Sequence, residues 1–359
     1  MKVGTITFHQ AINYGAILQT YALQKTLEKS GINNEIINYE FTRSGTKING
    51  FKGQLIKLIY NRSNQKRQKK FIEFSENYLK LSKIKLINES EKNKLNEEYD
   101  YFITGSDQVW NCNLTNFDKN FFLSFVTDDY KKIAYAASFG FDEIPKKNIS
   151  EYRTLLSTFQ SISVREKQGE KIIKELINRD VPCVLDPTLL IDEKEWTQIA
   201  KLPKESNYIL IYLMAKSKTI LKFAERLSKR TGCKIIWINA SKTELIKAKK
   251  IYSVGPEEFL GLFKNAKYVI TSSFHGTAFA INFNKQFFTE LLPFSAQVNS
   301  RLINILDLFD LKNRLIINGE NNNIETVIDY ESVNRKIESE KKISQNYLKK
   351  ALGFNEDEC

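Results

Sequence analysis

The strongest constraint on the fold is a repeated alternation of short apolar runs with helical patterns. The first half predicts strands at residues 2–8, 35–39, 101–104, 132–136, 161–164 and 183–185. The second half restarts the pattern at 208–214, 234–239 and 268–271, with weaker candidates at 286–290 and 315–317. Helical patterns lie between these runs, which is the order expected of parallel sheets built from βαβ units. The predicted class is therefore α/β.

The restart of the pattern predicts two lobes. A chain of 359 residues is longer than one typical core supports. Pro187 keeps Asp186 out of helical geometry, so we expect the chain to cross to the second lobe near residue 190. The prediction is an N-terminal Rossmann-like lobe at 1–190 with a basic helical insertion at about 43–85, a C-terminal Rossmann-like lobe at 191–329, and a helix with a tail at 330–359.

The net charge of +12 is concentrated in residues 43–85, which hold twelve Lys or Arg and two acidic residues. The same segment carries Phe51, Leu55, Leu58 and Ile59, so it is compatible with a basic amphipathic helix on an anionic membrane or a lipid diphosphate. A solvated pair of helices is the alternative. No nucleic-acid partner is predicted, because no nucleic-acid fold signature accompanies the charge.

The start of the chain reads as a strand and a helix rather than as an export signal, and charges interrupt every candidate membrane span. We therefore expect a cytoplasmic protein, with the inner face of the membrane as the site of any peripheral contact. Cys112, Cys183, Cys233 and Cys359 form no CxxC pair, so they are expected to be reduced thiols. Neither a metal nor a cofactor is predicted.

Ligands collect at the carboxyl ends of the strands in open α/β sheets, so polar residues that follow predicted strands are candidates. After the first strand come Asn13, Tyr14 and Gly15, where free helix amides could receive an anion. No GxGxxG is present, and an ordinary turn is the alternative. His9, in the same loop, is interpreted as a wall or core histidine.

The densest polar loop follows residues 101–104. Gly105 lets the backbone approach a ligand, Asp107 could take a proton from a sugar hydroxyl, and Trp110 could offer its ring to a sugar. The alternative is a helix cap with a core tryptophan. Arg165 directly ends the strand at 161–164, and its fork suits a carboxylate or phosphate unless it forms a structural ion pair with Glu166 or another acid.

The sharpest local signal follows the strand at 268–271, where hydroxyl residues precede a histidine and a glycine at the start of a helix. A histidine in this place can exchange protons near neutral pH while the adjacent amides hold an anion. His275 is the better placed of the two histidines in the chain. A buried structural histidine is the alternative.

Five motifs, in this order and spacing, resemble the polysaccharide pyruvyltransferase family: GSDQVWN at 105–111, SVRE at 163–166, DPT at 186–188, SSFHG at 272–276 and NSR at 299–301. The resemblance covers roughly residues 1–310. It implies two Rossmann-like lobes facing a cleft, as in GT-B glycosyltransferases. It also implies phosphoenolpyruvate as donor, a sugar or lipid-linked oligosaccharide acceptor, and a cyclic pyruvate ketal as product during capsule, exopolysaccharide or cell-wall polymer synthesis.

The resemblance implies His275 as general acid or acid/base, Arg165 as binder of the donor anion, and Asp107 as acceptor base or ligand. Further donor-binding residues would be Ser272, Ser273, Gly276, Thr277 and Arg301. The acceptor-binding set would be Asn13, Tyr14, Gly15, Ser106, Asp107, Gln108, Trp110 and Asn111.

Two positions depart from the family pattern, since Ser273 stands where many members carry Arg and Ala16 where many carry Asp. Arg301 or Lys285 is predicted to restore the cation, and Gln19 the polar contact.

Two other functions stay open. One is a GT-B glycosyltransferase with a nucleotide-sugar donor, and the other is a non-catalytic glycan or lipid-diphosphate binding protein. The pyruvyl donor is favoured because no acidic partner follows His275 until Glu290.

Overall fold

The computed structural model describes residues 1–41, 54–240, 246–293, 299–321 and 323–354. The chain forms two compact units that are not contiguous in sequence. Unit 1 comprises Met1–Gly45, Ser75–Ile191 and Lys336–Cys359, and unit 2 comprises Thr46–Phe74 and Asp192–Arg335. Helices α2 (Gln54–Tyr78) and α12 (Tyr330–Ala351) therefore contribute residues to both units, whereas the sequence-based division kept each of them whole.

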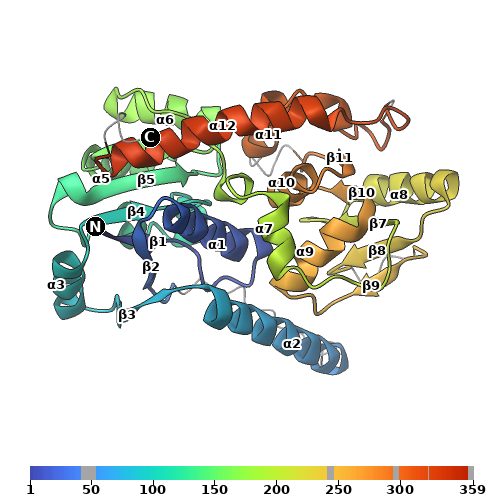
Figure 1. Ribbon diagram of the computed structural model, residues 1–359, viewed down its shortest axis with the longest axis horizontal. Coiled ribbons are helices and arrows are strands. Elements are labelled where there is room, and N and C mark those ends of the chain that lie inside the picture. Colours follow the sequence, from blue (N-terminus) through green and yellow to red (C-terminus); the bar gives the residue numbers. More distant parts are fainter. Residues whose placement is uncertain (42–53, 241–245, 294–298, 322, 355–359) are drawn as a thin grey trace. The chain divides into compact units, whose positions relative to one another are not determined.

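Unit 1 contains a six-stranded sheet in the order β3-β2-β1-β4-β5-β6, and all its pairs are parallel (Figure 1). Its strands are β1 (Lys2–Ile6), β2 (Asn33–Asn38), β3 (Leu81–Lys85), β4 (Tyr101–Thr104), β5 (Lys132–Ala137) and β6 (Ser161–Val164). This is the doubly wound order, in which the direction of winding reverses between β1 and β4. The inner strands are apolar because both faces of the sheet are covered, and every residue of β5 is buried.

The helices of unit 1 connect these strands. They are α1 (Tyr14–Lys29), α3 (Glu89–Glu98), α4 (Cys112–Thr115), α5 (Ile149–Ser157), α6 (Lys167–Ile177) and the second part of α12. Asn13 caps α1, because its side-chain oxygen accepts a hydrogen bond from the Ala16 amide at 3.2 Å. The cap fixes the helix start directly beyond the loop that follows β1.

Unit 2 contains a five-stranded parallel sheet in the order β11-β10-β7-β8-β9. Its strands are β7 (Tyr208–Tyr212), β8 (Ile235–Ile238), β9 (Lys249–Ile251), β10 (Ala266–Thr271) and β11 (Gln286–Thr289). The helices are α7 (Glu193–Ile199), α8 (Lys218–Thr231), α9 (Pro256–Asn265), α10 (Phe274–Asn282) and α11 (Ser300–Leu308). The order reverses between β7 and β10, so the loop that leads from β10 into α10 lies at the second reversal point.

The predicted strands differ from the observed ones at the sheet edges. Residues 183–185 and 315–317 form isolated bridges rather than strands. The edge strands β3 and β9 were not predicted. Most residues of β3 and β9 are only partly buried or exposed, so these strands carry lysines and lack the apolar pattern that identifies inner strands.

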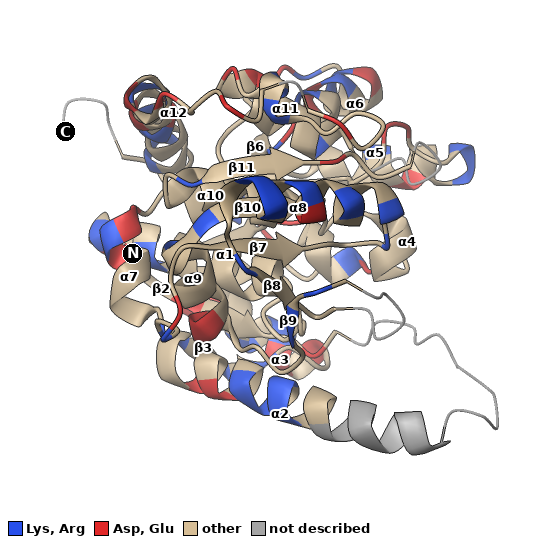
Figure 2. Cartoon of the chain, turned by 90° about the vertical axis from the view of Figure 1, so that its right-hand side faces the viewer, with Lys and Arg blue, Asp and Glu red and all other residues tan. Residues whose placement is uncertain are grey.

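Basic residues recur along the described part of α2 and along α8 (Figure 2). In α2, Lys70 is committed to an ion pair, with its ammonium 2.6 Å and 2.7 Å from the two carboxylate oxygens of Glu258. Residues 43–53 of the predicted basic insertion lie outside the described residues. Within the described part of the chain, no helix has the length and apolarity needed to cross a bilayer.

We predict that Gly105→Ala lowers stability by about 3 kcal/mol or more, the size of effect seen for severe steric conflict. Gly105 has φ +117°, and a Cβ there would lie 2.2 Å from the Tyr135 carbonyl oxygen. Gly31→Ala is the matched control, because Gly31 also has positive φ (+73°) but open space around it. The free energy of unfolding of the control should fall by only about 1–2 kcal/mol, because alanine is strained in a left-handed backbone conformation. Equal urea midpoints for the two variants would contradict the steric argument.

Candidate functional site

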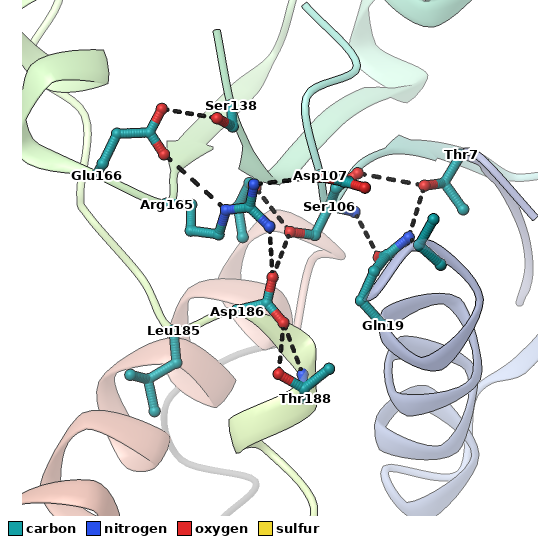
Figure 3. A network of polar contacts seen from close by, with 12 residues as sticks. Thr7, Gln19, Ser106, Asp107, Ser138, Arg165, Glu166, Leu185, Asp186 and Thr188 are labelled. Carbon is teal, nitrogen blue, oxygen red and sulfur yellow. Dashed lines mark hydrogen bonds and ion pairs between the residues drawn. The ribbon is translucent and has the colours of Figure 1, made fainter. Parts of the chain in front are cut away.

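A buried arginine organises the carboxyl edge of the unit 1 sheet (Figure 3). Arg165 directly follows β6, and its Nη1 lies 2.7 Å from Asp186 Oδ2 while its Nη2 lies 3.3 Å from Asp107 Oδ1. Glu166 Oε2 is 3.9 Å from its Nε. The Arg165 side chain is 1% exposed. Burial disfavours the charged guanidinium, but the carboxylates outweigh burial and raise the pKa of Arg165.

Both carboxylate oxygens of Asp186 accept hydrogen bonds. Its Oδ1 accepts hydrogen bonds from the amide and hydroxyl of Thr188 at 3.0 and 2.7 Å, which caps the turn η5 (Pro187–Leu189). Its Oδ2 accepts from Arg165 and lies 3.2 Å from Ser106 Oγ, whose single hydroxyl hydrogen it shares with the Ala136 carbonyl. Asp186 therefore joins the end of β6, the loop after β4 and the turn η5.

The loop after β4 is held from several sides. The Ser106 amide donates to Gln19 Oε1 at 3.1 Å, and Gln19 Nε2 donates to Thr7 Oγ1 at 2.8 Å. Ser106 Oγ donates to the Ala136 carbonyl at 2.9 Å. These contacts fix Asp107, which has φ +73° and a side chain that is 11% exposed. Asp107 is thus the least buried of the three carboxylates around Arg165.

The other predicted residues of unit 1 have structural partners. Asn111 caps α4 and donates to Gln108 Oε1 at 2.8 Å. Asn13 caps α1, while Tyr14 and Gly15 are buried in its first turn. Trp110 is fully buried in the apolar core, where its ring stacks on Phe122 at 5.9 Å between centroids. The tryptophan therefore offers no exposed ring face to a sugar, which corrects that expectation.

His9 is 1% exposed, in agreement with its interpretation as a core histidine. Its Nδ1 lies 3.3 Å from the Thr7 carbonyl oxygen, so this nitrogen carries the hydrogen in the neutral ring. Burial lowers the pKa of His9 to about 4, against the weaker opposite effect of the Thr7 carbonyl. His9 is therefore neutral in the fold at pH 7.

In unit 2 the predicted donor-binding residues gather at the start of α10. Ser273 caps the helix by accepting from the Gly276 amide at 3.3 Å, and Ser272 Oγ accepts from the Met214 amide at 3.0 Å. A Cβ on Gly276 would lie 2.3 Å from Thr271 Oγ1, so glycine is required for this close packing. Thr277 is fully buried, and its hydroxyl lies 3.5 Å from that of Thr289. His275, in the first turn, is 7% exposed.

The structure brings Arg301 into the same group. Its guanidinium carbon lies 6.0 Å from the centre of the Phe274 ring, and the Phe274 ring meets His275 edge-on at 5.1 Å between centroids. Lys285 immediately precedes β11 and so lies at the amino edge of the sheet, opposite to the end where β10 leads into α10. Of the two predicted replacement cations, Arg301 is therefore the one whose guanidinium lies beside Phe274, the residue that precedes His275.

The chemistry of the two groups differs. The unit 1 group has three carboxylates around one cation, whereas the unit 2 group combines a histidine, helix amides and an arginine. Among the described residues, no cluster of three or more His, Cys, Asp or Glu is arranged to hold a metal ion. The first group suits neutral hydroxyls and proton removal, and the second suits an anion and proton donation.

Solved structures with a similar fold are of the GT-B type, which defines the fold class. A UDP-GlcNAc 2-epimerase from Neisseria meningitidis bound to UDP-GlcNAc is 10% identical, with a TM-score of 0.53 and coverage of 98% of this chain and 99% of that chain. MnaA of S. aureus in complex with UDP is 13% identical, with a TM-score of 0.51 and coverage of 99% and 97%. At these identities the likeness concerns the fold alone.

The family is shown by sequence. A sequence model described as polysaccharide pyruvyl transferase matches residues 13–289, so the chain belongs to the polysaccharide pyruvyl transferase family and is a transferase. This confirms the family and the α/β, GT-B-like fold expected from the sequence. No curated protein matches the chain significantly.

Sequence reasoning missed the part that Asp186, Gln19, Thr7 and Ser138 play in the unit 1 group. Asp186 was noticed as a turn residue, and Gln19 was proposed only as a replacement contact. Ser138 Oγ donates to Glu166 Oε1 at 2.8 Å, which orients the third carboxylate. Two signals were available: Asp186 belongs to the DPT motif at 186–188, and both Asp186 and Ser138 follow apolar runs, as Asp107 and Arg165 do.

We predict that Arg165→Ala lowers stability by about 3–5 kcal/mol, because it leaves buried carboxylates without their cation. Arg335→Ala is the control, since Arg335 forms an ion pair with Glu331 in which both side chains are mostly exposed. The control should change stability by less than about 1 kcal/mol. Urea unfolding would measure both variants, and a loss no larger than that of the control would contradict the ion-pair assignment.

We predict that His9 destabilises the fold progressively as pH falls. Its pKa of about 4 lies below the value of about 6.5 in an unfolded chain, so protons favour the unfolded state. The contribution of neutral, buried His9 to the free energy of unfolding is present above pH 6.5 and is lost as pH falls towards 4. The stability difference between wild type and His9→Gln should shrink over this range in urea unfolding. A His9 ring signal titrating near pH 6.5 by NMR would refute the prediction.

Proposed function

We propose that this protein transfers the pyruvyl group of phosphoenolpyruvate to two hydroxyls of a sugar and forms a cyclic ketal. In this reaction the methylene carbon of the donor gains a proton and becomes a methyl group. Both acceptor oxygens bond to the central carbon, and inorganic phosphate leaves. One hydroxyl proton balances the new methyl group and the other leaves with the phosphate. Membership of the pyruvyl transferase family is the observation that carries the proposal.

In this proposal His275 donates the proton to the methylene carbon. Imidazole suits the task because it exchanges protons near neutral pH. The amides at the start of α10 and the guanidinium of Arg301 would hold the carboxylate and phosphate of the donor. Support comes from the gathering of His275, Ser273 and Arg301 around this helix start.

Asp107 is proposed to remove a proton from an acceptor hydroxyl. Support comes from its fixed backbone and from its being the least buried carboxylate of its group. Arg165 was expected to bind the donor anion. Its guanidinium is occupied by Asp186 and Asp107, so anion binding would require these ion pairs to open. We therefore propose that Arg165 positions Asp107 instead.

The acceptor is proposed to be a polysaccharide precursor carried on a lipid diphosphate, and the protein to work at the cytoplasmic face of the membrane. The basic residues 43–85 would then contact anionic lipid. Within the described part of this segment, Lys66 and Lys69 are exposed on α2, which supports such a contact. Lys70 would not take part, because it is paired with Glu258.

The first experiment would incubate the purified protein with phosphoenolpyruvate and a panel of lipid-diphosphate and nitrophenyl sugars. We expect acceptor-dependent phosphate release together with the mass gain of a carboxyethylidene group. Both His275→Ala and Asp107→Asn should lower kcat by roughly 10²–10⁴-fold, as expected for lost acid–base groups. Asp180→Asn is the control, because Asp180 is 88% exposed and forms an ion pair with the surface residue Lys174.

The same panel separates the competing functions. Turnover of a nucleotide sugar, without phosphate release from phosphoenolpyruvate, would replace the proposal by a glycosyltransferase. Binding of glycans or lipid diphosphates without turnover of any donor would indicate a binding protein. Thermal melting of each variant shows whether a lost activity reflects lost folding.

A further inference from the structure

A hydrogen bond from the C-terminal helix reaches the segment that carries Asp186. The Leu185 amide donates to Ser344 Oγ at 2.9 Å, although 159 positions separate the two residues. Ser344 is completely buried. Leu185 lies beyond the last ladder contact of its segment, the bridge between Val164 and Cys183. The serine of α12 therefore supplies an acceptor that a neighbouring strand would otherwise provide.

Tyr135 completes this contact. Its hydroxyl donates to the Leu185 carbonyl at 2.9 Å, and it also forms a side-chain hydrogen bond with Ser344. Burial raises the pKa of Tyr135 well above its usual value, so the hydroxyl stays protonated and can donate. Both main-chain groups of Leu185 are thus held by side chains, one from α12 and one from β5.

One turn further along α12, Tyr347 makes a second contact with the same sheet. Its hydroxyl donates to the Ala134 carbonyl at 2.8 Å. Ser163 Oγ donates to the same carbonyl at 3.1 Å and accepts from the Ala136 amide at 3.1 Å. The Ala136 carbonyl in turn accepts from Ser106, next to Asp107. Residues three apart lie on one face of a helix, so Ser344 and Tyr347 act on the sheet together.

The contact lies next to the ion-pair group. Leu185 precedes Asp186, whose Oδ2 is 2.7 Å from Arg165 Nη1, and Arg165 Nη2 is 3.3 Å from Asp107 Oδ1 (Figure 3). A buried amide that loses its acceptor must find another or move towards water. A shift of Leu185 would displace Asp186, and the short contacts would pass the displacement to Arg165 and Asp107.

We propose that Ser344 is a positioning residue for Asp107, acting through Leu185, Asp186 and Arg165. Helix α12 lies beyond residues 13–289, which the family model matches, so the family match does not cover this support for the site. The inference rests on the proposed function in one respect, because it takes Asp107 as the group that accepts a proton from the acceptor sugar.

The test compares Ser344→Ala with Ser344→Thr and with Ser339→Ala. Ser339 lies on the same helix but is exposed, so its change controls for altered helix propensity. Ser344→Ala should lower kcat about tenfold through displacement of Asp107, with a much smaller change in the KM for phosphoenolpyruvate. It should also shift the pH at which kcat is half-maximal, because the charges around Asp107 move. Ser344→Thr keeps the hydroxyl and should recover most of the activity.

Several results would overturn the proposal. A wild-type kcat and pH profile in Ser344→Ala would do so. A lower melting temperature and a smaller fraction of active protein, with an unchanged pH profile of kcat, would also overturn it, because that pattern indicates a purely structural role. If Ser344→Ala does not fold, Tyr347→Phe provides the second variant, and it should show a smaller change in kcat and pH profile of the same kind. Unchanged kinetics in a folded Tyr347→Phe would then count against the proposal.

Failure of the proposed function is distinguishable from failure of this inference. If the wild-type protein transfers no pyruvyl group, the proposed reaction is wrong. The role of the contact between Ser344 and Leu185 is then tested by measurements that do not depend on activity. Hydrogen exchange at the Leu185 amide should then be faster in Ser344→Ala than in wild type or Ser339→Ala, with a changed NMR signal for the Arg165 guanidinium. Unchanged exchange and an unchanged guanidinium signal would overturn the positioning role.

Discussion

The buried ion pair between Arg165 and Asp186 is the contact on which the organisation of unit 1 depends. A guanidinium that is 1% exposed requires carboxylate partners, because an unpaired buried charge is very costly. Those partners come from the loop after β4 and from the segment before η5. The pairing therefore fixes three separate parts of the chain relative to one another, and Asp107 takes its position from that arrangement.

Much of the fold follows from local patterns. The inner strand β4 and the edge strand β6 were predicted with their observed bounds, because both are short, mostly buried runs bounded by polar residues. The edge strands β3 and β9 were not predicted, since they carry lysines and, of their residues, only Ser82 of β3 is buried. Helix α12 was also predicted, but its contact with Leu185 depends on tertiary packing that no local pattern records.

The candidate site was predictable in location more than in role. The rule that ligands gather beyond strand ends identified Asp107, Arg165 and His275 from sequence. The role of each depends on partners that are distant in the chain. From sequence, Arg165 was interpreted as an anion binder, but in the structure Asp186 lies 2.7 Å from its guanidinium. Trp110 was interpreted as a contact for a sugar ring, but its own ring is buried in the core. Polar density in a loop thus identifies a constrained backbone, and a ligand contact needs separate evidence.

Charge distinguishes the two groups of residues in a way that position alone does not. Three carboxylates against one guanidinium leave the Arg165 group with an excess of negative charge when all are ionised, which opposes binding of an anion such as phosphoenolpyruvate. At the start of α10, the hydroxyls of Ser272 and Ser273 accept from backbone amides, while Arg301 and the helix amides favour an anion. The electrostatics therefore favour an anionic ligand at the start of α10 and an uncharged ligand beside the Arg165 group, each considered within its own unit.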